Sequence, residues 1–176
     1  MTRRIKPYQQ GNLDSLCGAY CAVNVVHYLC GPFPENKATD VFLNILDHLE
    51  DSTDLVSRIY EGTGRREIRQ LMNFLMKKYP IIWHKPFEAS TDLSVHKVWK
   101  SITQFLHEHN GIVIAGLCYK GGGHWTLIRE ITPKSIRLFD SDNMKVVYRH
   151  QCSVKKHSKN RPYVLQPSTL YFVHRS

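Results

Sequence analysis

The sequence predicts an α+β protein in which helices occupy the first part of the chain and an antiparallel sheet follows. Between residues 16 and 109, apolar residues recur at spacings of three and four in four segments, which is typical of amphipathic helices. From residue 111 onward, short apolar runs are separated by turn residues, which favours strands. This segregation is the α+β pattern, and 176 residues fit a single domain, residues 1–176, with its own core.

Residues 1–15 contain turn-forming residues and no apolar period, so we expect them to be irregular. The segment 16–30 places apolar residues on one face and is followed by a Gly-Pro pair that would end a helix. Three later segments carry the same kind of apolar stripe and are also predicted to be helices: 37–49, 64–78 and 94–109.

The segment 111–119, GIVIAGLCY, is almost continuously apolar, which predicts a strand buried on both faces. The segments 125–131 and 136–139 are predicted to form a hairpin, because a turn containing Pro133 separates them. Shorter strands are expected at 81–83, 146–148 and 170–174.

The chain is basic, with a formal net charge of +9 and a pI near 9.4. Such a charge favours acidic partners, whether an acidic protein substrate, nucleic acid or an anionic membrane. The segment 149–161, RHQCSVKKHSKNR, is interpreted first as a solvated loop and, as an alternative, as a surface for an acidic substrate or nucleic acid. The sequence shows no nucleic-acid-binding fingerprint, so a nucleic-acid role is not favoured.

Five cysteines, an odd number, in a chain long enough to fold without cross-links argue against a disulfide framework. The first ten residues are basic and are not followed by the apolar stretch of a signal peptide. No run approaches the roughly 18 apolar residues that a membrane span requires. We therefore expect a cytoplasmic protein without a membrane span, with export by a route that uses no cleaved signal as the alternative.

Cys17 stands at the start of the first predicted helix. Free backbone N–H groups and the positive end of the helix dipole would stabilise a thiolate at this position. Gly18 follows, and its missing side chain is expected to leave room for a substrate carbonyl. An isolated cysteine is more often a small buried core residue, so the interpretation of Cys17 as a nucleophile depends on its partners.

Those partners are expected before and after the helical region. Gln10 precedes the first helix, and its side-chain amide could donate to the same oxyanion as the Cys17 backbone N–H. Three glycines lead into His124, which is expected at the first residue of a strand, where it could serve as a base.

Asp140 ends the strand that follows, in LFDSDN, and a carboxylate there could orient the histidine ring. A two-residue turn between the two strands would place Asp140 on the face opposite to His124. A contact between His124 and Asp140 therefore requires a loop with an odd number of residues, such as three, or a β-bulge near Pro133. Asp142 and, less favourably, Asn143 are the alternative orienting residues.

Together, QGNLDSLCGAYC, GGGHWTLI and LFDSDN resemble the papain-like cysteine peptidases, and most closely their compact bacterial groups, the bacteriocin-leader and staphopain-like peptidases. The resemblance implies a papain-like fold, with Cys17 as nucleophile, His124 as base, Asp140 as orienting residue and Gln10 as oxyanion donor. Gln10 precedes Cys17 by seven residues, where six is usual in the family. No likeness extends over residues 31–110.

Such a site predicts a thiol peptidase that hydrolyses a peptide or isopeptide bond through an acyl-enzyme, acting on a protein or peptide substrate and needing no cofactor. Two alternatives keep the fold: an acyltransferase, transglutaminase-like or ubiquitin-like-modifier deconjugating activity on the same triad, and a non-catalytic binding module. A zinc site is a third alternative. The sequence offers no second pair of ligands to complete the set Cys17, Cys21, His27 and Cys30.

Overall fold

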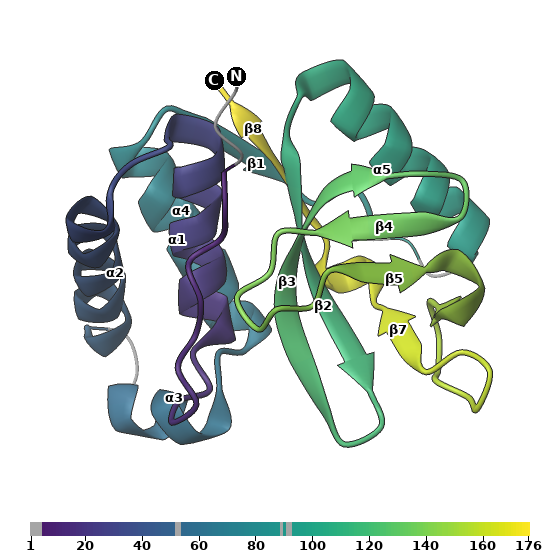
Figure 1. Ribbon diagram of the computed structural model, residues 1–176, viewed down its shortest axis with the longest axis horizontal. Helices are drawn as coiled ribbons and strands as arrows, with labels where there is room; N and C mark the ends of the chain where they lie inside the picture. Colours follow the sequence, from purple (N-terminus) through teal and green to yellow (C-terminus); the bar gives the residue numbers. More distant parts are fainter. Residues whose placement is uncertain (1–4, 52–53, 89, 91–92) are drawn as a thin grey trace.

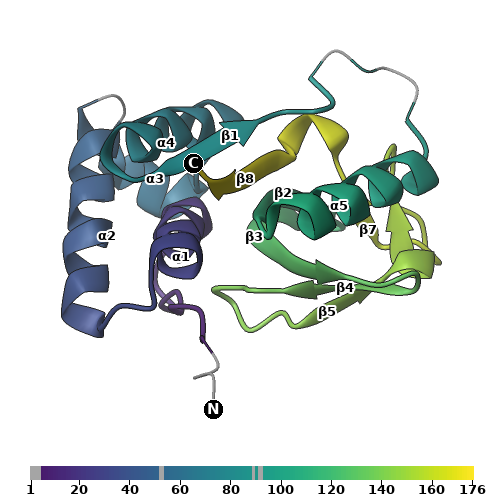
Figure 2. The ribbon, with the colours of Figure 1, turned by 90° about the horizontal axis from the view of Figure 1, so that it is seen from above.

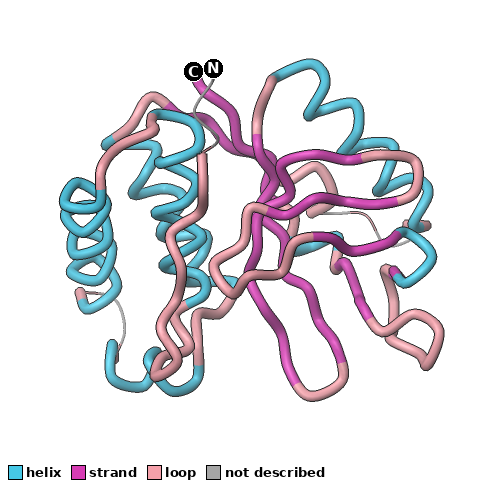
Figure 3. Tube along the Cα trace, in the orientation of Figure 1, coloured by secondary structure: helices cyan, strands magenta, loops and turns pink. Residues whose placement is uncertain are grey.

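The computed structural model describes residues 5–51, 54–88, 90 and 93–176, and it confirms the α+β class. A layer of helices lies beside an antiparallel sheet, and a further helix covers the other face of that sheet (Figures 1 and 2). Figure 3 shows α1, α2, α3 and α4 grouped on one side of the strands and α5 on the other. The helices are α1 (Cys17–Cys30), α2 (Glu35–Glu50), α3 (Leu55–Glu61), α4 (Arg65–Lys78) and α5 (Val95–His109).

The four helices predicted from apolar periodicity all form, with ends within two residues of those expected. Helix α3 was not predicted. It has seven residues, none of them fully buried, so it carries no apolar stripe that the sequence could reveal. Its start is fixed locally, because the Asp54 side chain accepts a hydrogen bond from the Val56 N–H at 3.1 Å.

The described residues form eight strands in one sheet, in which β1, β8, β2, β3, β4 and β5 are neighbours in that order. The short strand β7 pairs with both β2 and β6, and the β6–β7 pair is the parallel one. Strands β6 and β7, of two and three residues, were not predicted, because they lie in or next to the basic segment 149–161. The strands are β1 (Ile81–His84), β2 (Ile112–Tyr119), β3 (Gly122–Ile131), β4 (Ser135–Leu138), β5 (Val146–Tyr148), β6 (Cys152–Ser153), β7 (Tyr163–Leu165) and β8 (Tyr171–Arg175).

Strand β2 lies in the middle of the sheet and is buried on both faces, as its sequence indicates. On one face, Ile112 and Ile114 pack with residues of α1, α2 and α4. On the other face, Val113 and Ala115 pack with α5. The helical layer and α5 therefore enclose the sheet. Within the helical layer, α1 packs directly against β3.

The hairpin of β3 and β4 meets the condition for an Asp140–His124 pair in one of the two expected ways. Its turn has two residues, because the Thr132 N–H donates to the Ser135 carbonyl at 2.8 Å. The register then shifts between Ile128 and Glu130, so that a β-bulge falls at Arg129. Beyond this bulge Ile128 faces Leu138, and the Asp140 side chain is brought to the face of His124.

Two expectations about chain segments need correction. His124 does not begin its strand but lies two residues inside β3, because Gly122 and Gly123 pair with Tyr119 and Cys118 across the hairpin. The segment 149–161 is not loop throughout. It begins with a 3-10 turn (Arg149–Gln151) and with β6, where Cys152 is buried.

None of the helices in the described ranges has both the length and the apolar character required to cross a membrane.

Candidate active site

A cleft of about 840 Å³ lies where the start of α1 meets the β2–β3 hairpin. Its walls come from the N-terminal segment before α1, from the loop between α3 and α4, and from the hairpin, which Figure 1 shows beside one another. Three of the four predicted site residues, Gln10, Cys17 and His124, line this cleft, and Asp140 contacts His124 from behind it.

Cys17 is the first residue of α1 and is buried, with 8% of its surface exposed. No described side chain caps this end of the helix, so the dipole and the first N–H groups can act on an anion there. The Trp125 N–H donates to the Cys17 sulfur at 3.5 Å, across 108 residues of chain. The sulfur therefore lies against β3, next to His124.

Gly18 serves a different purpose from the one expected. A Cβ atom at this position would lie 2.7 Å from side-chain atoms of both Ile68 and Thr63. The space that a side chain would take is filled by the protein itself, not left for a substrate. The loop at Thr63 is also held from β3, because the Trp125 indole N–H donates to the Thr63 carbonyl at 2.6 Å.

His124 and Asp140 form a buried pair, with 2.7 Å between Nε2 and Oδ2. The second oxygen of Asp140 accepts from the N–H groups of Asp142, at 2.8 Å, and Met144, at 3.0 Å. The Asp140 carboxylate is thus fixed on both oxygens. Because Asp140 takes Nε2, the other ring nitrogen of His124 is left for Cys17.

The pKa values of this pair move apart. Burial alone would lower the pKa of His124, but hydrogen bonds to Asp140 and Cys17, together with their charges, raise it from 6.5 to about 10. Burial would raise the pKa of Asp140, but the hydrogen bond from His124, the Thr126 hydroxyl and the histidine charge hold it below its ordinary value of 3.8. A charged histidine beside a charged aspartate is the favoured state near neutral pH.

Gln10 lines the cleft together with Cys17. One hydrogen of its side-chain amide is donated to the Asp14 carbonyl, and its backbone N–H donates to the Ser141 carbonyl at 2.8 Å. Its side-chain oxygen is buried and has no hydrogen-bond partner among the described residues. The amide is therefore anchored at the edge of the cleft, and its nitrogen makes no second hydrogen bond to a described residue.

The alternative orienting residues shape the loop that carries Asp140. Asp142 lines the cleft and donates its backbone N–H to Asp140. Asn143 has a left-handed backbone, with φ of 59°, and borders a different cavity. Of these three residues, Asp140 is the one that accepts a hydrogen bond from His124.

The remaining four cysteines are free thiols as well. Burial, followed by the charges of Cys17 and Asp140, raises the pKa of Cys21 well above its ordinary value. Burial also raises the pKa of Cys152 to about 11. Cys118 lines the cleft with Cys17. In the described part of the chain, no three His, Cys, Asp or Glu side chains are grouped so as to hold a metal ion.

The sequence did not identify three residues that support the site. Trp125 contacts both the Cys17 sulfur and the Thr63 carbonyl, and Gln9 donates its amide to the Asp140 carbonyl at 3.0 Å. Trp125 follows His124 directly, and Gln9 precedes Gln10, so adjacency to the motifs was the available signal. Thr63 stands in a short loop between two glycines, and nothing in the sequence around it indicates a role in the site.

A scan against protein-family models finds no matching family, and a search of curated proteins finds no relative. Function is therefore inferred from the geometry of the cleft and from the sequence motifs.

Proposed function

We propose that the protein is a cysteine peptidase of papain-like architecture, which hydrolyses a peptide or isopeptide bond through an acyl-enzyme. The observation that carries this proposal is the meeting of Cys17 and His124 in one cleft, with Asp140 hydrogen-bonded to the far side of the histidine ring. A thiol at a helix start, a base and an orienting carboxylate are the parts of an activated sulfur nucleophile.

In the proposed reaction, the Cys17 thiolate attacks the substrate carbonyl carbon while His124 is protonated. The negative oxygen that forms is received by the Cys17 backbone N–H and by the second amide hydrogen of Gln10. His124 then gives its proton to the leaving amine as the carbon–nitrogen bond breaks, which leaves a thioester on Cys17. A water molecule, deprotonated by His124, attacks the thioester and releases the acid and the thiolate.

The cleft also supports the alternative in which an amine, rather than water, resolves the thioester, because the cleft is open to solvent along its glycine-lined hairpin. Transglutaminase-like acyl transfer and removal of ubiquitin-like modifiers would use the same three side chains. A product that forms only when an amine is added, without hydrolysis, would favour this alternative over the peptidase.

A peptide vinyl-sulfone probe tests the proposal, because it traps an activated thiol without knowledge of the natural substrate. We expect labelling at neutral pH in the wild type and loss of labelling in Cys17→Ala and His124→Ala. Cys118→Ala is the matched control, since Cys118 is a free thiol in the same cleft. Equal labelling of Cys17→Ala and the wild type would refute the proposal.

Replacing Gln10 by alanine is expected to lower kcat by about 10²- to 10³-fold with little change in KM, because one oxyanion donor is lost. The melting temperature should be measured alongside, since the same amide also bonds to the Asp14 carbonyl. Gln104→Ala, on the exposed face of α5, is the control. An unchanged kcat in a folded Gln10→Ala protein would remove this residue from the oxyanion site.

The His124–Asp140 pair should leave a signature in stability against pH. The raised pKa of His124 contributes stability that is complete below 6.5 and is lost as the pH rises to about 10. The lowered pKa of Asp140 contributes stability that is present above 3.8 and is lost as the pH falls further. The difference in melting temperature between the wild type and Asp140→Asn should therefore be largest between these limits, from 3.8 to 6.5.

Asp142→Asn is the matched control for this measurement, because it removes a carboxylate from the same loop without touching His124. Its difference from the wild type should be small across the same range. A difference for Asp140→Asn that does not change with pH would show that the two groups are not a charged pair.

A further inference from the structure

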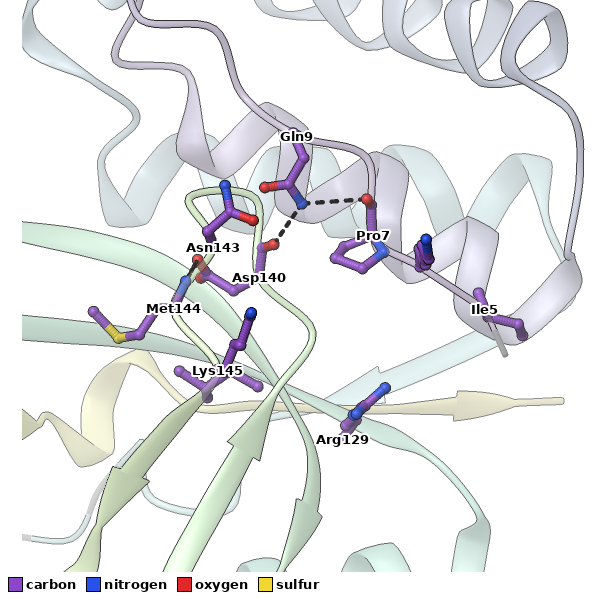
Figure 4. A pocket seen from close by; sticks show the side chains of 10 residues that line it. Ile5, Pro7, Gln9, Arg129, Asp140, Asn143, Met144 and Lys145 are labelled. Carbon is purple, nitrogen blue, oxygen red and sulfur yellow. Dashed lines mark hydrogen bonds between the residues drawn. The ribbon is translucent and has the colours of Figure 1, made fainter. Parts of the chain in front are cut away.

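A second cavity, of about 610 Å³, borders Asp140 but is not lined by Cys17 or His124 (Figure 4). Its walls come from the N-terminal segment, from the bulge in β3 and from the loop that carries Asp140 to β5. Figure 4 shows Gln9 and Asn143 near Asp140, with Lys145 and Arg129 below them in this view. Its volume lies within the range of roughly 300–1,000 Å³ that small-molecule sites occupy.

The cavity gathers positive charge that forms no ion pair with a described residue. Lys6, Arg129 and Lys145 line it, one from each of the three segments, and within the described ranges none of them forms an ion pair. Arg129 is half-buried, and the rest of its guanidinium, unlike the buried Nε atom, can meet a ligand in the cavity. A guanidinium with no carboxylate partner binds an anion favourably.

The Asp140 carboxylate, which borders the cavity, forms no ion pair with these three cations. Asp140 already accepts from His124 with one oxygen and from two backbone N–H groups with the other. The Gln9 amide is also engaged, since its nitrogen donates to the carbonyls of Asp140, at 3.0 Å, and Pro7, at 3.2 Å. The free groups that face the cavity are therefore mainly cationic.

We propose that this cavity is a binding site for a small, multiply charged anion of the polyphosphate or phosphorylated-metabolite class. Arg129 would donate to two oxygens of one phosphate, and the two lysines would contact its neighbours. The bulge that brings Asp140 to His124 also places Arg129 at this cavity. A soluble ligand fits the site, since it is recessed between three segments of the chain.

Occupancy would stabilise the walls that also hold Asp140. The Leu138 N–H donates to the Lys145 carbonyl at 2.9 Å, and the Met144 N–H donates to Asp140 at 3.0 Å. A ligand that binds the folded chain and not the unfolded chain raises its melting temperature. Binding itself does not require the proposed peptidase activity, so the two proposals can fail separately.

The test is a calorimetric titration of the full chain with sodium triphosphate at low ionic strength, with melting temperatures measured in parallel. We expect one site per chain, weakened at least about 10-fold in Arg129→Gln and in Lys145→Gln. Arg137→Gln and Lys77→Gln remove the same charge outside the cavity, and we expect a change of less than about 2-fold in each. Because Lys145 is exposed, its variant decides the matter if Arg129→Gln does not fold.

Several outcomes would overturn this site. Equal weakening in the cavity variants and the controls would mean that triphosphate responds only to the net charge of +9. The absence of saturable binding to triphosphate would also overturn the site. Binding to vesicles of anionic lipid without binding to triphosphate would overturn it too, because the ligand would then be a membrane surface rather than a soluble anion.

Discussion

Replacing Cys17 by alanine is expected to abolish turnover while leaving the fold intact. The sulfur is the atom that forms the thioester, and nothing else in the proposed mechanism can take its place. In catalytic triads, loss of the nucleophile costs on the order of 10⁶-fold in kcat. The change removes one buried sulfur at a helix start, so we expect the free energy of unfolding to change by about 1 kcal/mol or less.

The measurement is hydrolysis of a peptide selected from a fluorogenic library with the wild-type protein, together with the melting temperature of each variant. Cys118→Ala is the control, because it also removes a thiol from the cleft. It should retain activity within a few-fold of the wild type. Activity that survives in Cys17→Ala but falls in Cys118→Ala would move the nucleophile to the other cysteine.

Replacing His124 by alanine is expected to lower kcat almost as much as loss of Cys17, and replacing Asp140 is expected to lower it less. His124 takes and gives the proton in both halves of the reaction, whereas Asp140 acts through the histidine ring. In triads of this kind, loss of the base costs on the order of 10⁶-fold and loss of the carboxylate about 10⁴-fold.

Asp140→Asn is a sharper variant than Asp140→Ala for this comparison. An asparagine keeps an oxygen that can accept from the N–H groups of Asp142 and Met144, so the loop is preserved while the charge beside His124 is removed. A loss in Asp140→Asn equal to or greater than that in His124→Ala would show that the roles are assigned to the wrong residues.

The helices and the long strands were predictable because their apolar patterns repeat over many residues. Helix α3 and strands β6 and β7 were not: α3 has no buried residue, and β6 and β7 lie in or next to a basic segment without apolar alternation. The central strand β2 was identified by its continuous apolar run, which is typical of a strand buried on both faces.

The candidate site was predictable as a set of residues but not as a geometry. The need for a register change between His124 and Asp140 followed from the two-residue period of a strand. The position of the β-bulge at Arg129 could not be predicted, because a bulge depends on how the sheet packs. Gly18 was misinterpreted for a related reason: Thr63 and Ile68, which fill the space beside it, are more than forty residues away in sequence.

The pairing of the Cys17 sulfur with the His124 ring is tested most directly by the rate at which iodoacetamide alkylates each cysteine, followed residue by residue with mass spectrometry. At pH 6 we predict that Cys17 reacts at least about 10-fold faster than Cys118, and that His124→Gln removes the difference. If Cys17 and Cys118 react equally in the wild type, or if His124→Gln leaves the Cys17 rate unchanged, the thiol is not activated by this histidine.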